Sequence, residues 1–219
     1  MSEPIVVHGI PGSPYIRKPL LVCEEKGAPW RLAAMAFGSG AQKSPEYLAL
    51  NPFGRLPTFE HGDFRLYEAQ AIGRYIDRVF GGPSLTPADP RQAARMDQVL
   101  NIVDWYVMPS ISGGVAFNRV VKPKFGMPVD EAAVAAALPQ ARTCVHALED
   151  ILGGQAYFAG EAVSLADLFA YGHFEFLGQT PEGADLLAGS PLLGWMERMA
   201  ERPSVQKTTW DRLTEAQAA

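Results

Sequence analysis

The stretch from Ser44 to Tyr75 constrains the fold of this chain more than any other segment. Asn51-Pro52-Phe53-Gly54 is typical of a tight turn, and Pro57 follows it at the start of a short strand pattern. His61-Gly62-Asp63 indicates a hairpin turn, because glycine accepts the positive φ that tight hairpin turns require. A second strand pattern then leads to Glu68, where a helical pattern begins. Two strands and an acidic helix start therefore follow one another with almost no connecting residues.

The first third of the chain alternates between strand and helix patterns. The predicted strands cover residues 4–8, 30–36, 58–61 and 64–67, and the predicted helices cover residues 13–26 and 69–80. An irregular segment or short helix is expected before the third strand. A strand, a crossover and a second strand predict a parallel pair, and the close hairpin adds antiparallel strands. The predicted order is βαβαββα.

A linker and a helical region follow. Residues 80–90 contain two glycines and three prolines, which is typical of a linker. Helical spacing then covers residues 91–108, 130–152, 164–176 and 190–201, and no strand pattern appears after residue 90. The fold class is therefore α/β plus all-α, with an N-terminal domain at 1–82, a linker at 83–89 and an all-helical domain at 90–219. Ser164 and Asp167 are spaced as a reciprocal helix cap, a structural feature.

Composition excludes several classes of protein. The net charge of −5 and a pI of about 5.4 argue against nucleic acid as a partner, because phosphate binding needs a basic face. Cys23 and Cys144 form no CxxC, and no Cys/His spacing suits zinc, so we expect no metal and two free thiols in a reducing compartment. No apolar run approaches the ~18 residues of a membrane span, and no secretory signal is recognisable. We therefore expect a cytoplasmic protein.

Four segments together resemble the cytosolic glutathione transferases. They are SPYIRK at 13–18, NPFGRLP at 51–57, YEA at 67–69 and GEAVSLAD at 160–167. Each segment alone is weak evidence for the family, but the four in this order and spacing are strong evidence. The resemblance covers nearly the whole chain. The serine-type branches, the tau class and related bacterial enzymes, are the most similar. The resemblance implies a thioredoxin-like N-terminal domain, a helical C-terminal domain, a homodimer, and a detoxification activity with glutathione as co-substrate.

Ser13 is the catalytic candidate. It precedes Pro14 at a helix start, where the ordinary role of serine is N-capping. The resemblance implies instead that its hydroxyl donates a hydrogen bond to the thiolate of bound glutathione, which is the nucleophile. Free thiols titrate near ~8.5, and lowering that pKa by about two units requires roughly 2.7 kcal/mol. One charge-assisted hydrogen bond and a helix dipole have this combined size.

The resemblance also implies a glutathione site. Pro57 resembles the cis-proline that turns the backbone of Leu56 toward the cysteinyl part of glutathione; the alternative is a trans proline at a strand edge. Lys43 and Arg55 match positions that hold the glycyl carboxylate, and the alternative for both is a solvated surface cation.

Glu68 and Ala69 match the pair that receives the γ-glutamyl group at a helix N-terminus. The second position usually carries Ser or Thr, whereas Ala69 has no hydroxyl. One lost hydrogen bond to a charged group is worth about 1.5–3 kcal/mol. We therefore expect this site to bind glutathione less tightly than the family pattern would, unless the adjacent Gln70 replaces the missing hydroxyl.

The acceptor substrate is expected between the domains. Its candidate pocket residues, which are equally typical of a helical core, are Ile10, Trp105, Tyr106, Pro109, Phe117, Tyr171 and Phe174. His8 ends the first strand and is expected to be an ordinary structural histidine.

Two further functions stay open beside conjugation to an apolar electrophile. The first is a glutathione-dependent peroxidase or a specialised isomerase or lyase on the same site. The second is a non-catalytic binding or regulatory protein of this fold. Ala69 supports the second, as does Pro19, which falls inside the first helix. Pro19 is expected either to kink that helix or to make its first turn irregular, and that turn carries Ser13.

Overall fold

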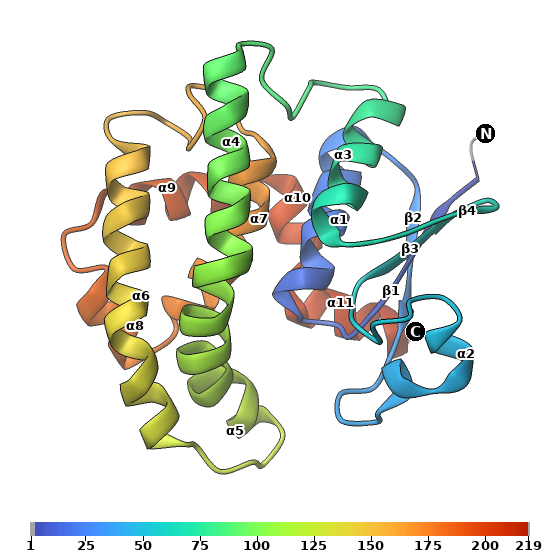
Figure 1. The fold of residues 1–219 in the computed structure, drawn as a ribbon, viewed down its shortest axis with the longest axis horizontal. Coiled ribbons are helices and arrows are strands. Elements are labelled where there is room, and N and C mark those ends of the chain that lie inside the picture. The colour runs from blue at the N-terminus through green and yellow to red at the C-terminus, as the bar shows by residue number, and fades with distance from the viewer. Residues whose placement is uncertain (1–2, 219) are drawn as a thin grey trace. The chain divides into compact units, whose positions relative to one another are not determined.

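A four-stranded mixed sheet forms the first of two units in the computed structural model, which describes residues 3–218 (Figure 1). The strand order is β2-β1-β3-β4. β1 (Ile5–Gly9) pairs in parallel with β2 (Trp30–Ala34) and antiparallel with β3 (Thr58–His61). β4 (Phe64–Tyr67) continues the sheet as the second strand of the hairpin. The predicted parallel pair and hairpin are confirmed.

Two helices cover this sheet with their apolar faces. α1 (Pro14–Lys26) packs against β1 and against α3 (Ala69–Val79). The connection from β2 to β3 contains a short 3-10 helix, η1 (Ala41–Lys43), and α2 (Pro45–Leu48), where a short helix was expected. The fully buried apolar side chains of these elements include Ile5, Val7, Ile16, Leu20, Phe59, Ile72 and Ile76.

A buried ion pair fixes the start of the linker on this unit. Lys26 Nζ donates to Asp77 Oδ1 at 3.1 Å and to the Pro83 carbonyl at 2.8 Å, and both charged side chains are 3% exposed. The same Asp77 oxygen accepts the Leu85 N–H at 2.9 Å. Because these groups join the ends of α1 and α3 to the chain that leaves them, the first half of the linker is a structured part of the unit.

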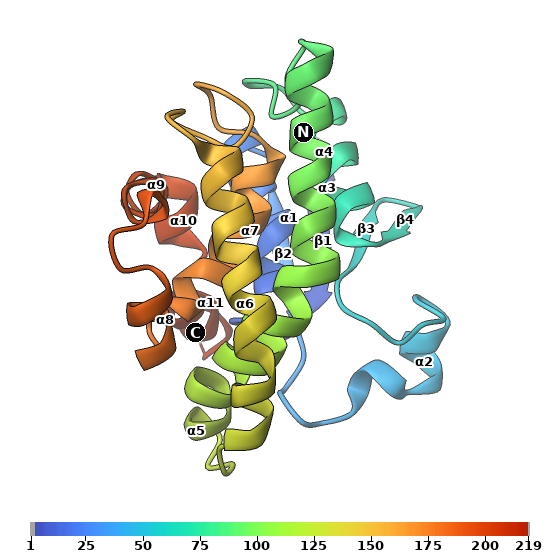
Figure 2. The same ribbon diagram turned by 60° about the vertical axis from the view of Figure 1, so that its left-hand side comes forward.

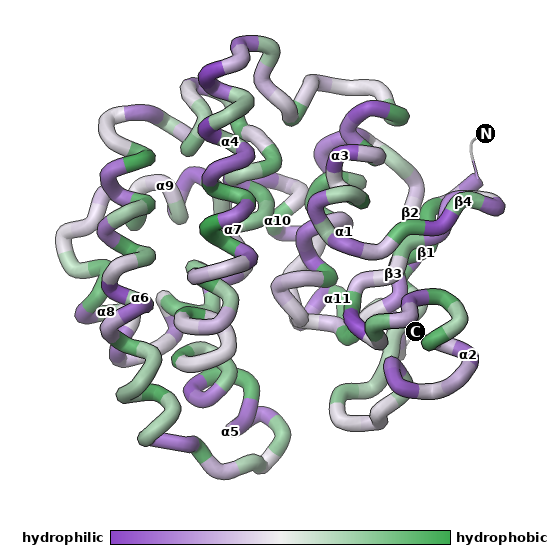
Figure 3. Tube along the Cα trace, viewed as in Figure 1, coloured by the Kyte–Doolittle hydropathy of each residue, from purple (hydrophilic) through white to green (hydrophobic). Residues whose placement is uncertain are grey.

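The second unit covers Thr86–Ala200 and is helical throughout its regular elements. Its elements are α4 (Pro90–Ile102), η2 (Val103–Val121), α5 (Lys122–Lys124), α6 (Glu131–Leu152), α7 (Leu165–Leu177), α8 (Pro181–Leu186) and α9 (Pro191–Ala200). η2 packs against both α6 and α7, and α4 packs against α7 (Figure 2). Hydrophobic and hydrophilic residues alternate along α4 and α6, as amphipathic helices require (Figure 3).

The η2 segment continues α4 without a break, although sequence spacing predicted a helix ending at Met108. It is a π-helix, and at its end the Lys122 N–H bonds to the Phe117 carbonyl five residues back. Pro109 lies inside it. Two polar side chains donate hydrogen bonds to the backbone of the same segment. Ser110 Oγ donates to the Tyr106 carbonyl at 2.5 Å, and Asn118 Nδ2 donates to the Gly114 carbonyl at 2.7 Å. Packing against two neighbouring helices stabilises this segment despite its helix-breaking residues.

The predicted cap of α7 is confirmed and is wholly buried. Asp167 Oδ2 accepts the backbone N–H and the hydroxyl of Ser164, both at 2.9 Å. Asp167 Oδ1 accepts the Phe158 N–H and the Trp195 indole N–H, both at 3.0 Å. One carboxylate therefore joins the start of α7, the loop before it and α9.

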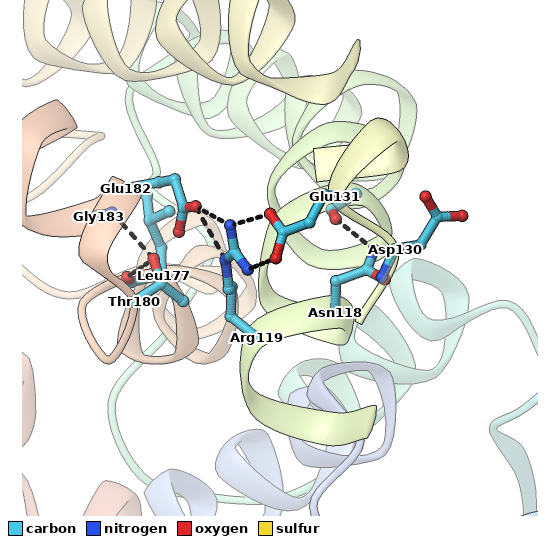
Figure 4. Close-up of polar contacts among 9 residues, drawn as sticks. Asn118, Arg119, Asp130, Glu131, Leu177, Thr180, Glu182 and Gly183 are labelled. Carbon is cyan, nitrogen blue, oxygen red and sulfur yellow. Dashed lines mark hydrogen bonds and ion pairs between the residues drawn. The ribbon is translucent and has the colours of Figure 1, made fainter. Parts of the chain in front are cut away.

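Arg119 joins the starts of two further helices in the same unit (Figure 4). Its guanidinium donates to both carboxylate oxygens of Glu131 at 2.6 and 2.7 Å, and to Glu182 Oε1 at 2.9 and 2.6 Å. Glu131 lies in the first turn of α6 and Glu182 in that of α8, where the helix dipole also favours a negative charge. The hydrogen bonds from Arg119 hold the pKa of both carboxyl groups below its usual value.

The C-terminal segment packs with the first unit, whereas residues 90–219 were expected to form one helical domain. From Glu201 onward the chain, with α10 (Pro203–Lys207) and α11 (Trp210–Ala218), belongs with the sheet. α10 packs on α1. The Glu25 carboxylate accepts a bidentate hydrogen bond from the Arg202 guanidinium, at 2.8 and 2.6 Å, and a further hydrogen bond from the Ser204 hydroxyl. These bonds join residues far apart in the chain, and hydrophobic spacing carries no signal of them.

Candidate glutathione site

The sheet register brings three loops to one edge. β1 ends beside the start of β3, since His8 pairs with Thr58, and Thr58 in turn pairs with Tyr67 at the end of β4. The chain therefore leaves β1 toward Ser13, enters β3 from Pro57 and leaves β4 toward Glu68 at the same edge. Most of the predicted glutathione-site residues lie on these three loops.

A tight turn delivers Ser13 to the start of α1. The Ser13 N–H bonds to the Ile10 carbonyl at 3.1 Å, and Gly12 has a φ of 84°. Proline at the second position and a positive-φ glycine at the third are the signature of a type II turn. Ser13 then occupies the N-cap position with extended backbone, yet its hydroxyl makes no capping bond to the helix. The ordinary role of an N-cap serine is therefore not the one that its side chain performs.

Pro19 does not disturb this arrangement. The first turn of α1 is regular, with the Arg17 N–H bonded to the Ser13 carbonyl at 3.0 Å, and the helix runs on through Pro19 to Lys26. Gly27 ends the helix in the left-handed conformation with a φ of 61°. The first turn is therefore not irregular, which was one of the two effects expected of Pro19.

The loop before β3 is held by buried polar groups. The Arg55 carbonyl accepts the Tyr47 hydroxyl at 2.8 Å and Asn51 Nδ2 at 3.0 Å, and Tyr47 also bonds to the Thr58 hydroxyl at 2.6 Å. Asn51, itself 1% exposed, accepts the Phe53 N–H at 3.1 Å. Sequence reasoning found the turn but missed Tyr47, whose position in α2 gave no sign that it reaches this loop.

The predicted ligand groups of this loop have distinct surroundings. The Leu56–Pro57 peptide bond is cis, as predicted. The Arg55 side chain is exposed. Lys43 is also exposed, and its Nζ donates to the Phe53 carbonyl at 3.2 Å, which holds it over the loop. Lys43 therefore lies against this loop, and the exposed Arg55 side chain belongs to it. The Arg55 carbonyl is held by the hydrogen bonds from Tyr47 and Asn51.

Glu68 has an unusual backbone conformation at the start of α3. Its φ of 70° and ψ of 110° make it the one residue other than glycine with positive φ in the described part of the chain. Such a conformation costs on the order of 1–3 kcal/mol and persists only where the surroundings demand it. It leaves the Glu68 side chain exposed and places Ala69, 5% exposed, as the first residue of α3. The first N–H groups of α3 lie at this point, with the dipole that favours an anion.

His8 lies beside the site in a structural role. Its Nε2 is 2.6 Å from Glu60 Oε1, and the other oxygen of Glu60 pairs with Arg65 at 3.3 Å. The hydrogen bond from His8 is the main reason why the pKa of Glu60 is held below its usual value. These contacts account for His8 without a catalytic role.

The acceptor-pocket candidates divide by burial. Ile10 is half-buried in the turn before Ser13, and Phe117 is half-buried in η2. Trp105 and Tyr106 are 73% and 51% exposed, and Pro109 is also exposed. Tyr171 and Phe174 are buried in α7, and both rings contact the buried Trp195 edge-on. This packing favours the core alternative for the last two residues.

Family models match most of the chain. The model described as glutathione S-transferase, N-terminal domain, covers residues 3–78, and the model described as glutathione S-transferase, C-terminal domain, covers residues 98–203. A probable glutathione S-transferase GSTF2 of Oryza sativa is 31% identical over 205 residues, which are 93% of this chain and 95% of the relative.

Solved structures agree with these models. Glutathione S-transferase III in its apo form is 33% identical with a TM-score of 0.83, over 94% of this chain and 95% of that one. Glutathione S-transferase I from maize, in complex with an atrazine glutathione conjugate, is 28% identical with a TM-score of 0.82, over 96% and 98%. The plant relatives are of the phi class, so the likeness to the tau class was imprecise.

Among residues 3–218, no three His, Cys, Asp or Glu side chains gather as a metal site, and no helix has the length and apolar character to cross a membrane.

Proposed function

The chain belongs to the glutathione S-transferase family, and on that premise we propose that it transfers the thiolate of glutathione to an apolar electrophile, with Ser13 as the hydrogen-bond donor that stabilises the thiolate. The observation that carries the proposal is the Ser13 hydroxyl. It stands at the N-terminus of α1, on the same sheet edge as the Pro57 and Glu68 loops, and makes no capping bond of its own. A hydroxyl at a helix N-terminus that does not cap the helix suits an anion.

Each part of glutathione has a proposed partner at this edge. The backbone of Leu56, turned by Pro57, pairs with the cysteinyl part as an added strand would. The Glu68 carboxylate accepts the ammonium of the γ-glutamyl group, and the first N–H groups of α3, beginning at Ala69, receive its carboxylate. Lys43 and Arg55 supply positive charge for the glycyl carboxylate.

The chemical step follows from this placement. The glutathione thiol loses its proton to solvent, and the Ser13 hydroxyl donates a hydrogen bond to the remaining thiolate. The dipole of α1 adds further stabilisation of the negative charge. The thiolate then attacks a carbon of the electrophile, a carbon–sulfur bond forms, and the leaving group departs with the electron pair of its own bond. Ser13 stays protonated and unmodified throughout.

An aryl halide is the proposed electrophile class. The maize relative holds the glutathione conjugate of atrazine, a chlorotriazine. Replacement of the ring chlorine by sulfur is the step described above, and it needs no metal.

We further propose a cytoplasmic homodimer. Cys23 and Cys144 are buried free thiols, as a reducing compartment favours. Phe53 and Phe64 leave 61% and 43% of their surface exposed on the first unit, which is apolar area for a second copy to cover. Light scattering should give about twice the chain mass of 23.8 kDa. The mass of a single chain at micromolar protein would contradict the dimer.

Calorimetry and a conjugation assay together test the function. We expect saturable glutathione binding, and turnover of both an aryl halide and atrazine by the native protein. Ser13→Ala should bind glutathione but lose most of its activity at neutral pH. Absence of binding at millimolar glutathione would support the non-catalytic alternative. Full activity of Ser13→Ala would remove Ser13 from the mechanism and leave the rest standing.

A further inference from the structure

The indole of Trp210, the first residue of α11, lies against the turn that carries Ser13. A methyl group added at Gly12 would overlap Cγ, Cδ2 and Cε2 of this indole. Gly12 is thus required twice, once by its positive φ and once by the ring that covers it. Trp210 is separated from this turn by nearly the whole chain, so the contact is a long-range one.

The segment that carries Trp210 is anchored to the same helix that begins at Ser13. Arg17, one turn into α1, donates through Nη2 to the Val205 carbonyl at 3.0 Å and through Nε to the Thr208 hydroxyl at 3.3 Å. Thr208 is fully buried and also donates to the Ser204 carbonyl at 2.8 Å. Two residues later the chain reaches Trp210.

These contacts form a closed ring of interactions, here called the circuit. Ser13 is joined to Arg17 by the first turn of α1, and Arg17 is hydrogen-bonded to Thr208. The chain then leads from Thr208 to Trp210, whose indole packs on Gly12 next to Ser13. A turn inside such a circuit has few conformations available, since each side is held by hydrogen bonds or ring packing. Precision at this point matters, because a displacement of about 1 Å can cost on the order of 100-fold in rate.

We propose that Trp210 is a positioning residue for the reaction, which fixes the Ile10–Ser13 turn so that the Ser13 hydroxyl points at the sulfur of bound glutathione. This inference rests on the proposed function, since it assigns to Trp210 an effect exerted through Ser13. Trp210 itself donates nothing to the reacting atoms. Its indole is half-buried, and its role is to exclude other conformations of the turn.

The pH dependence of kcat/KM separates positioning from mere stability. A variant that is partly unfolded loses activity by the same factor at every pH. A variant with a misplaced Ser13 loses activity where the thiolate needs stabilisation and recovers it at alkaline pH, where the thiol ionises unaided. We expect Trp210→Ala to lose about 10- to 100-fold in kcat/KM at neutral pH and to shift the midpoint of the profile upward. Trp210→Phe, which keeps a ring on Gly12, should restore most of both.

Three variants complete the experiment. Arg212→Ala, on the exposed face of the same helix, should match the native protein, because the one ion pair of Arg212 among residues 3–218 is with the exposed Glu215 at 3.8 Å. Gly12→Ala disturbs the same contact from the other side and should shift the midpoint upward even if Trp210→Ala does not fold. Ser13→Ala combined with Trp210→Ala should show the midpoint of Ser13→Ala alone, because the indole acts through that hydroxyl.

The outcomes distinguish the two proposals. If Ser13→Ala shifts the midpoint and neither Trp210→Ala nor Gly12→Ala does so, the positioning role is wrong and the proposed function stands. If Ser13→Ala leaves the midpoint unchanged, the role of Ser13 in the proposed function fails first, and the role of Trp210 fails with it.

Discussion

Replacing Asp167 should destabilise the helical unit more than the loss of any ordinary helix cap. Its fully buried carboxylate accepts four hydrogen bonds, three of them from N–H groups of Phe158, Ser164 and Trp195. In Asp167→Ala these three donors lose their acceptor with no route to water. A buried donor without a partner costs about 1–3 kcal/mol, so the free energy of unfolding should fall by roughly 3–9 kcal/mol. Since whole domains are stable by about 5–15 kcal/mol, this loss approaches complete unfolding.

Asp167→Asn separates the hydrogen bonds from the packing. The amide oxygen can still accept from Phe158 and Trp195, while the amide nitrogen faces the Ser164 N–H, which is another donor. One buried donor is therefore lost, and we expect about 1–3 kcal/mol. Asp89→Ala is the matched control, because Asp89 caps α4 through the N–H groups of residues 91 and 92 at an exposed position. Its loss should cost about 1 kcal/mol.

Urea unfolding followed by far-ultraviolet circular dichroism and by tryptophan fluorescence measures these differences. The expected order of destabilisation is Asp167→Ala, then Asp167→Asn, then Asp89→Ala. If Asp167→Ala were no worse than the exposed-cap control, the buried carboxylate would not be the junction described above.

Three further perturbations follow from the structure. Ala69→Ser should tighten glutathione binding by roughly 10- to 100-fold in calorimetry, because it restores a hydroxyl at the start of α3; an unchanged constant would mean that another group already serves that carboxylate. Burial raises the pKa of Glu25, but hydrogen bonds from Arg202 and Ser204 outweigh it and lower the pKa below its ordinary 4.5. The stabilisation by Glu25 is therefore present above pH 4.5 and lost as pH falls through the lowered pKa, so Glu25→Gln should lower the Tm at pH 7 and match the native protein in strong acid. Of the two carboxylates on Arg119, Glu182→Gln should lower the Tm more than Glu131→Gln, since their side chains are 14% and 70% exposed; equal effects would contradict this.

Local patterns predicted the sheet and most of the longer helices. The hairpin of β3 and β4 and the ends of α1 at Pro14 and Gly27 depend on turn and cap residues, which act within a few positions. α10 and α11 were missed because they are short, and α10 is stabilised by bonds to Arg17 and Glu25. Such contacts join distant parts of the chain and leave no periodicity in the sequence.

The candidate site also has a part that the sequence predicts and a part that it does not. The residues on its three loops follow from motif and resemblance, and the strand register explains why the loops meet. The positive φ of Glu68 was not predictable, because glutamate strongly disfavours it and only the surrounding fold imposes it. Tyr47 and Trp210 support the site from a distance in sequence, and no short pattern indicates either contact.

The most direct test of the central claim is the pKa of the glutathione thiol bound to the protein, measured from the ultraviolet absorbance of the thiolate across a pH titration. We predict that the native protein lowers this pKa by about two units from the free value near ~8.5. Ser13→Ala should return it most of the way while glutathione stays bound. The same depressed pKa in both proteins would contradict the claim that the Ser13 hydroxyl stabilises the thiolate.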